Sequence, residues 1–151
     1  RNKISDRGAS NIGIGISKCV QLQTLKLNMN DNKISDSGAS SFTAELSTLA
    51  LLQTLCLYMI DYENLISESF YCRAAKLISN SASISTLRLG FNNYDTFLKS
   101  GEIINCRNIK ILDLYVEESD DETTMKKYQR LAQKIKRLVK LNVDSQYFED
   151  Q

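Results

Sequence analysis

The chain has 151 residues, 42% of them hydrophobic, a size and composition that suit one compact domain or one short repeat array with a sizeable core. Its 19 basic and 18 acidic side chains leave a net charge of +1, so no overall field draws the chain toward nucleic acid or an anionic membrane. The sequence has no histidine and no Cys-x-x-Cys pair, which excludes histidine-dependent catalytic triads and the common zinc frameworks.

The chain opens on a stretch, Asn2 to Ser10, that returns at Asn32 to Ser40 with a single difference, Arg7 against Ser37. In both copies a serine and an aspartate can cap the start of a helix, and apolar residues follow at steps of three or four. These apolar positions are Ala9, Ile12 and Ile16 in the first copy and Ala39, Phe42, Leu46 and Leu49 in the second. No strand pattern precedes the first copy, so residues 1–151 are expected to form a single array that is an internal or C-terminal fragment of a longer chain.

A short strand pattern recurs five times along the chain. Residues 22–27, Leu-Gln-Thr-Leu-Lys-Leu, return at 52–57 as Leu-Gln-Thr-Leu-Cys-Leu. Looser copies follow at 84–89, 109–114 and 138–143, so that successive copies start 30, 32, 25 and 29 residues apart. Self-similarity at this period indicates a solenoid, and the alternation within each copy puts the leucines on one side of a strand and the polar residues on the other.

The segments between the strand copies are predicted to be helices. A helical pattern covers about residues 67–79, a turn and helix start fall at 92–95, and a long helix is expected through about Leu138, with Ser119 and Glu122 at capping-box spacing. Proline is absent, and helices of this length serve as crossovers between parallel strands. The predicted fold is α/β: a right-handed strand–helix solenoid with a parallel concave sheet of about five strands and helices on the convex side.

These copies resemble the leucine-rich repeat family. Residues 22–30 and 87–92 carry its pattern of spaced leucines that ends in an asparagine. The period near 30 residues, with Ile-Ser-Asp-x-Gly-Ala opening a helix, is similar to the ribonuclease-inhibitor-like subfamily, in the asparagine-rich form frequent in ciliated protozoa. The resemblance implies a horseshoe segment with a protein-binding concave face and no catalytic residues. Ile60 and Glu117 stand where asparagines are expected, so irregular turns are predicted at both places.

The residues between the strand leucines form the predicted binding surface. They fall into columns across the five strands, and the tyrosines and the arginine among them are types enriched at binding hot spots. Gly90, between two tyrosines, is expected to leave a notch. The competing interpretation is an ordinary solvated strand face. The predicted partner-binding residues are Lys26, Asn28, Cys56, Tyr58, Arg88, Asp113, Tyr115 and Asn142.

The four cysteines are irregularly spaced and are interpreted as reduced, structural thiols of an intracellular protein. Cys56 is the one expected to face outward, flanked by Lys26 and Arg88, and a simply exposed thiol is the plainer interpretation there than an activated one. Asp113 and the acidic run at 117–122 lack the glycine-containing loop spacing of a calcium site and are interpreted as solvated acids. No metal, no cofactor and no catalytic residue is therefore predicted.

A basic cluster follows the acidic run, between Lys126 and Lys140. Nucleic-acid binding is one interpretation, and a solvated helix face is the plainer one, because acids at a helix start and bases toward its end complement the helix dipole. The only interleaved aromatic residue is Tyr128, which the predicted core uses, so no ring is left to stack on bases. Nucleic acid is therefore not an expected partner.

The leading hypothesis is a protein-interaction module or scaffold within a larger intracellular assembly, without enzymatic activity or a small-molecule substrate of its own. One alternative is a regulatory or targeting domain of a larger enzyme such as a protein kinase. Another is a nucleic-acid binder acting through the basic final helix. The sequence contains neither an apolar run long enough for a membrane span nor a signal-peptide pattern, so a cytoplasmic location is expected. The ciliate-like repeat style adds a cytoskeletal or ciliary association to this expectation.

Overall fold

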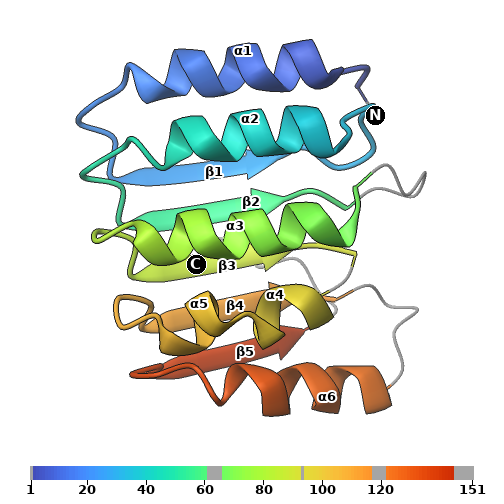
Figure 1. Ribbon diagram of the computed structural model, residues 1–151, viewed down its shortest axis with the longest axis vertical. Helices are drawn as coiled ribbons and strands as arrows, with labels where there is room; N and C mark the ends of the chain where they lie inside the picture. The colour runs from blue at the N-terminus through green and yellow to red at the C-terminus, as the bar shows by residue number, and fades with distance from the viewer. Residues whose placement is uncertain (1, 61–65, 93, 117–121, 145–151) are drawn as a thin grey trace.

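Five parallel strands with helices between them make up the part of the chain that the computed structural model describes, which is residues 2–60, 66–92, 94–116 and 122–144. The strands pair in chain order, β1-β2-β3-β4-β5 (Figure 1). The strands are β1 (Thr24–Asn28), β2 (Thr54–Tyr58), β3 (Thr86–Gly90), β4 (Ile111–Tyr115) and β5 (Lys140–Asp144). The helices are α1 (Asp6–Ser17), α2 (Asp36–Leu46), α3 (Glu68–Asn80), α4 (Asp95–Lys99), α5 (Gly101–Asn105) and α6 (Glu122–Ala132).

Each strand aligns with its neighbour at the residue that the repeat predicts. The register partners on one side of the sheet are Leu25, Leu55, Leu87, Leu112 and Leu141. The three members in central strands are at most 1% exposed, whereas Leu25 and Leu141 in the edge strands are half-buried. The predicted register is confirmed. It is strongly specified, because a slip of one residue would turn every leucine to the opposite side of the sheet.

The leucine side of the sheet packs against the helices and forms the core. Phe42 in α2, Phe70 in α3 and Phe97 in α4 are fully buried in the same cluster as the strand leucines. Parallel strands require crossover segments, and each crossover helix needs the sheet to bury its apolar stripe. The predicted α/β class and the five-stranded parallel sheet are therefore confirmed. We call the other side of the sheet, which carries the residues between the leucines, the open face.

The Ser-Asp pair that starts α1 and α2 ties one unit to the next. Asp6 accepts two hydrogen bonds of 2.6 Å, one from the Ser35 backbone N–H and one from the Ser35 hydroxyl. Ser35 also caps its own helix by accepting a bond from the Ser37 N–H. Gly38 makes room for this contact, because a Cβ atom there would lie 2.6 Å from the Cα atom of Asp6. The repeated Ile-Ser-Asp-x-Gly motif is thus a contact between units.

The same contact recurs one unit later with more partners. Asp36 accepts hydrogen bonds from the Ser67 backbone N–H at 2.6 Å, from the Ser67 hydroxyl, and from the Ser69 hydroxyl at 2.8 Å. Arg73 lies 3.6 Å away as a counter-ion. Burial alone would raise the pKa of Asp36, but the serine bonds and the Arg73 charge outweigh burial and hold this pKa below its ordinary value. We call this repeated contact between helix starts the aspartate ladder.

A tyrosine takes over the linking role in the second half of the chain. Tyr94 is fully buried, and its hydroxyl accepts a hydrogen bond from the Phe91 N–H at 2.9 Å and donates one to the Tyr115 carbonyl oxygen at 2.6 Å. Burial raises the pKa of Tyr94 well above its ordinary value, so the hydroxyl keeps the proton that it donates. The neighbouring Asp95 binds Lys127 of α6 at 2.6 Å. Different residue types therefore join successive units at equivalent places.

The turns after the strands follow the expected asparagine pattern only in part. Asn30 Oδ1 accepts a hydrogen bond from the Ile60 N–H at 2.8 Å and so connects two successive turns. Ile60 is buried and has no polar side-chain atom with which to continue the series, and Asn92 is exposed. The irregular turn predicted at Glu117 and the capping residue Ser119 lie outside the described residues.

One helix prediction is wrong in extent. The final helix was expected to continue through about Leu138, but α6 ends at Ala132. Arg137 then adopts a left-handed backbone conformation with φ 66°, which redirects the chain. Val139 enters the sheet directly afterwards, through a backbone hydrogen bond from its N–H to the residue before β4. A helix as long as the apolar spacing suggested would have left too few residues to return to the sheet.

We expect Asp36→Asn to lower the urea midpoint at pH 7, because an amide accepts fewer hydrogen bonds than a carboxylate and does not attract Arg73. Folding lowers the pKa of Asp36, so the carboxylate contributes its full stability above the ordinary value of 3.8 and loses this contribution as the pH falls through the folded-state pKa. The difference between wild type and variant should therefore shrink in acid, which urea unfolding across this pH range measures. Glu68→Gln, at the same position one unit later and exposed, should show a smaller difference throughout. A difference independent of pH would contradict the aspartate ladder.

Candidate functional site

The open face brings all the predicted partner-binding residues to one side of the sheet. One row across the five strands consists of Lys26, Cys56, Arg88, Asp113 and Asn142. A second row, two residues further along each strand, consists of Asn28, Tyr58, Gly90, Tyr115 and Asp144. The common register therefore places side by side residues that are separated by 25 to 32 positions in the sequence.

Three of these residues are less accessible than predicted. Cys56 is 3% exposed, Asp113 is 2% exposed and Tyr115 is 8% exposed. The predictions of Cys56 as an exposed thiol and of Asp113 as a solvated acid are therefore wrong. In the row across the strands, Cys56 stands between the longer side chains of Lys26 and Arg88, and Asp113 is held by hydrogen bonds from Arg88 and Asn142. Cys56 and Asp113 therefore lie beneath the accessible side chains of the open face and expose almost no area of their own.

The accessible residues gather on the first three strands. Lys26 and Asn28 on β1 are exposed, and Tyr58 on β2 and Arg88 on β3 are half-buried. We call these four residues the accessible patch. Asn142 on β5 is also half-buried but stands two strands away from it. The accessible patch combines two cations, one aromatic ring and one amide, a mixture suited to polar and acidic surfaces of another protein.

A hydrogen-bond network holds Arg88 in place. Its Nε donates to Asp113 Oδ2 at 3.0 Å, and Asn142 Nδ2 donates to Asp113 Oδ1 at 2.7 Å. Each carboxylate oxygen thus has a donor, as a buried charge requires. The Arg88 side chain remains 31% exposed, so its guanidinium also reaches the surface. The network restricts the Arg88 side chain in advance. Ordering this side chain would therefore cost less conformational entropy in any contact that Arg88 makes with another molecule.

The notch predicted at Gly90 is filled. A Cβ atom at Gly90 would lie 2.5 Å from the Cδ1 atom of Tyr58, so the tyrosine ring leans over the glycine. The ring then meets Tyr115 edge-on, with centroids 6.3 Å apart and an interplanar angle of 74°. Glycine is needed here for side-chain space. The Tyr58 ring therefore fills the space beside Gly90 and packs against the nearly buried Tyr115, so the two tyrosines do not form the walls of a notch.

The basic side chains of α6 are largely committed to structural pairs. Lys127 binds Asp95 at 2.6 Å, and this hydrogen bond raises the pKa of Lys127. Lys126 binds Glu122 of the same helix at 2.6 Å. Tyr128, the aromatic residue of this helix, is 5% exposed, which agrees with its predicted place in the core. These pairs favour the interpretation of the α6 part of the cluster as a solvated helix face, whereas Lys134 to Lys140 follow the end of the helix. Among the described residues, no group of three or more Asp, Glu, Cys or His side chains could hold a metal ion.

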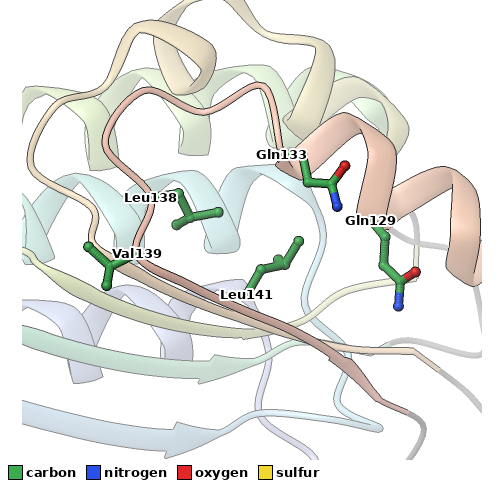
Figure 2. Close-up of a pocket in the computed structure, with 5 residues that line it drawn as sticks. All are labelled: Gln129, Gln133, Leu138, Val139 and Leu141. Carbon is green, nitrogen blue, oxygen red and sulfur yellow. The ribbon is translucent and has the colours of Figure 1, made fainter.

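A groove at the C-terminal end of the array was not predicted from the sequence. It has a volume of about 470 Å³ and lies between α6 and the start of β5. Figure 2 shows Gln129 of α6 and Gln133, which follows the end of that helix, on one side and Leu138, Val139 and Leu141 on the other. Val139 is 79% exposed, although the apolar pattern of the sequence does not distinguish it from a core residue. Only the early end of α6 reveals that none of the described helices covers Val139.

No protein-family model, curated protein or solved structure matches this chain. Among the residues that the structure describes, none of the helices has both the length and the apolar character needed to cross a bilayer.

The burial of Cys56 predicts two classes of thiol in the native chain. Cys19 and Cys72 are exposed and should react rapidly with a reagent such as DTNB, whereas Cys56 and Cys106 should react only as the chain opens. Timed release of thionitrobenzoate should therefore show two fast thiols under native conditions and four in urea. Cys56→Ser should remove one slow thiol and leave the fast phase unchanged. A native Cys56 as reactive as Cys72 would show that its row is open to solvent.

Proposed function

We propose that the chain is a leucine-rich-repeat protein-interaction module of the ribonuclease-inhibitor-like type, which binds a protein partner through the open face. The observation that carries this proposal is the alignment of the accessible patch. Lys26, Tyr58 and Arg88 come from three adjacent strands and share one side of the sheet. The repeat pattern of the sequence, the sequential parallel strands and the unit-to-unit contacts are all what a solenoid of this type requires.

The partner should present acidic and planar side chains to the accessible patch. Lys26 offers an exposed cation at the edge of the sheet, and Arg88 offers a cation that Asp113 orients. Tyr58 provides a rigid ring between them. Arginine and tyrosine contribute most at the centre of an interface, where water is excluded, whereas a rim lysine mainly affects the rate of association.

The size of the open face limits the affinity. Five strands about 4.8 Å apart span about 19 Å, and three outward residues per strand cover about 10 Å. The product is of order 200 Å², or about twice that with side-chain relief, against roughly 800 Å² per partner in a standard stable interface. Binding through the open face alone should therefore be weak, and a tight complex must use additional surface.

The test is calorimetry of the purified chain and its variants against a partner isolated by affinity capture. Tyr58→Ala and Arg88→Ala should each weaken binding by about tenfold or more, because they remove hot-spot residue types from the middle of the patch. Lys26→Glu should slow association and change its salt dependence. Lys76→Glu, the same charge reversal at an exposed position of α3 on the helical side, is the matched control and should have little effect. Loss of binding in the control with none in the patch variants would assign the site to the helices instead.

A further inference from the structure

All five described strands begin at the same border of the sheet, because they are parallel and in register (left in Figure 1). We call this part of the surface the strand-start border. It consists of the connections that lead from each helix to the strand that follows. These connections are residues 18–23, 47–53, 81–85, 106–110 and 133–139, and the structure describes all of them.

The charges of the chain are separated between this border and the opposite one. The connections at the strand-start border contain basic residues and no acidic residue. The basic residues are Lys18, Arg107, Lys110, Lys134, Lys136 and Arg137, and Lys140 follows as the first residue of β5. At the opposite border, where the helices begin, α1, α2, α3, α4 and α6 each start with an acidic residue. The net charge of +1 is therefore a sum that hides a basic border.

The cations are concentrated in the two connections that precede β4 and β5. These connections lie side by side, because the Lys136 N–H donates to the Ile104 carbonyl oxygen at 3.0 Å and the Val139 N–H donates to the Lys110 carbonyl oxygen at 2.7 Å. All their basic side chains are exposed. None of these side chains forms an ion pair among the described residues, unlike the paired lysines of α6. The cations are therefore available to an external anion.

Exposed apolar side chains lie on the same border. Three of the large apolar residues that the structure leaves exposed, Val20, Leu51 and Val139, belong to these connections. Among the described residues, the other exposed one is Ile14, on α1. Val139 is the most exposed of them and directly precedes Lys140. The strand-start border thus combines cations with aliphatic side chains.

The exposure of this border does not depend on what stands at either end of the array. Strands β2 and β4 each have a neighbouring strand on both sides. Leu51 and Gln53, before β2, are nevertheless exposed, as are Arg107 and Lys110, before β4. Further units would add strands along the sheet and would leave this border uncovered.

We propose that the strand-start border binds the surface of a bilayer that contains anionic lipid. The headgroups attract the cations, and the interfacial region beneath the headgroups accepts aliphatic side chains such as Val139. Nucleic acid fits this border less well, because the five connections contain no aromatic residue to stack on bases and a phosphate backbone offers no apolar contact. Binding through this border leaves the open face accessible, so the proposal does not depend on what the open face binds.

Co-sedimentation of the full chain with lipid vesicles tests the proposal. The chain should bind vesicles of phosphatidylcholine that contain about 30% phosphatidylserine, and should bind pure phosphatidylcholine at least about tenfold more weakly. Added salt should release the chain, because it screens the attraction between the cations and the lipid. The double variant Arg107→Gln with Lys110→Gln should bind about 25-fold more weakly, at about fivefold for each lost cation.

Matched variants separate this border from the rest of the surface. Lys3→Gln with Lys33→Gln makes the same change in net charge at exposed positions of the opposite border and should bind like wild type. Val139→Ser should weaken binding by about fivefold, because the variant loses an apolar contact with the interfacial region. Ile14→Ser, on α1, should have no effect. All these positions are exposed, so the variants should remain folded, which their urea midpoints check.

Three results would overturn the proposal. The first is equal binding to the two kinds of vesicle, or binding to neither. The second is an equal loss of binding in the two double variants. The third is tighter binding to a DNA duplex than to the anionic vesicles, with no effect of Val139→Ser, which would assign the cations to a phosphate backbone. Tyr58→Ala, which should weaken binding of a protein partner, should leave vesicle binding unchanged, so the two proposals can fail separately.

Discussion

The contact between the helix starts of successive units is the interaction on which the rest of the structure depends. A parallel sheet could pair in several registers, and each shift by one residue would exchange the core side and the open face. Asp6 at Ser35 and Asp36 at Ser67 each join an acid in one unit to the cap of the next helix. Seven residues connect the end of β1 to the start of α2, so a fixed helix start limits where the strand can end. Local capping and long-range order are therefore provided by the same two residue types.

This order has a direct consequence for the open face. With the strands in register, side chains of like position stand in rows, and a residue can be nearly buried by its row neighbours even on the side of the sheet away from the core helices. Asp113 illustrates the cost and its compensation: a nearly buried carboxylate is tolerated because Arg88 and Asn142 each donate to one of its oxygens. The same bonds orient Arg88 toward the surface. The contacts that satisfy the buried carboxylate thus also fix the position of Arg88 on the proposed binding surface.

Most of the architecture could be predicted from the sequence, because the repeat is strong. The spacing of leucines predicted all five described strands and their register, in which Leu25, Leu55, Leu87, Leu112 and Leu141 are partners. Only one register buries all of these leucines, because side chains alternate between the two sides of a strand. The early end of α6 was missed because apolar spacing continues beyond Ala132 and does not report the left-handed conformation of Arg137. The partners of Asp6 and Asp36 were also not predicted. A capping pattern concerns residues of a single helix, whereas these two aspartates accept hydrogen bonds from the start of the next helix.

Accessibility was the least predictable property of the candidate site. The alternation of residues along each strand predicted which side of the sheet a residue faces. This prediction is confirmed for Cys56 and Asp113. Their burial depends on which side chains stand beside them on the adjacent strands, which a pattern along one strand does not contain. The filling of the expected notch at Gly90 has the same origin, because the space that a glycine leaves was taken by Tyr58 from the adjacent strand.

The central claim, that hydrogen bonds between helix starts couple successive units, is tested most directly by a double-mutant cycle on Asp36 and Ser67. Urea unfolding of Asp36→Ala, Ser67→Ala and the double variant gives the coupling free energy between the two side chains. For a charge-assisted contact that joins two units we predict a coupling of about 1 kcal/mol or more. Additive single effects, with a coupling indistinguishable from zero, would contradict the account, because the two residues would then act only as independent caps of their own helices.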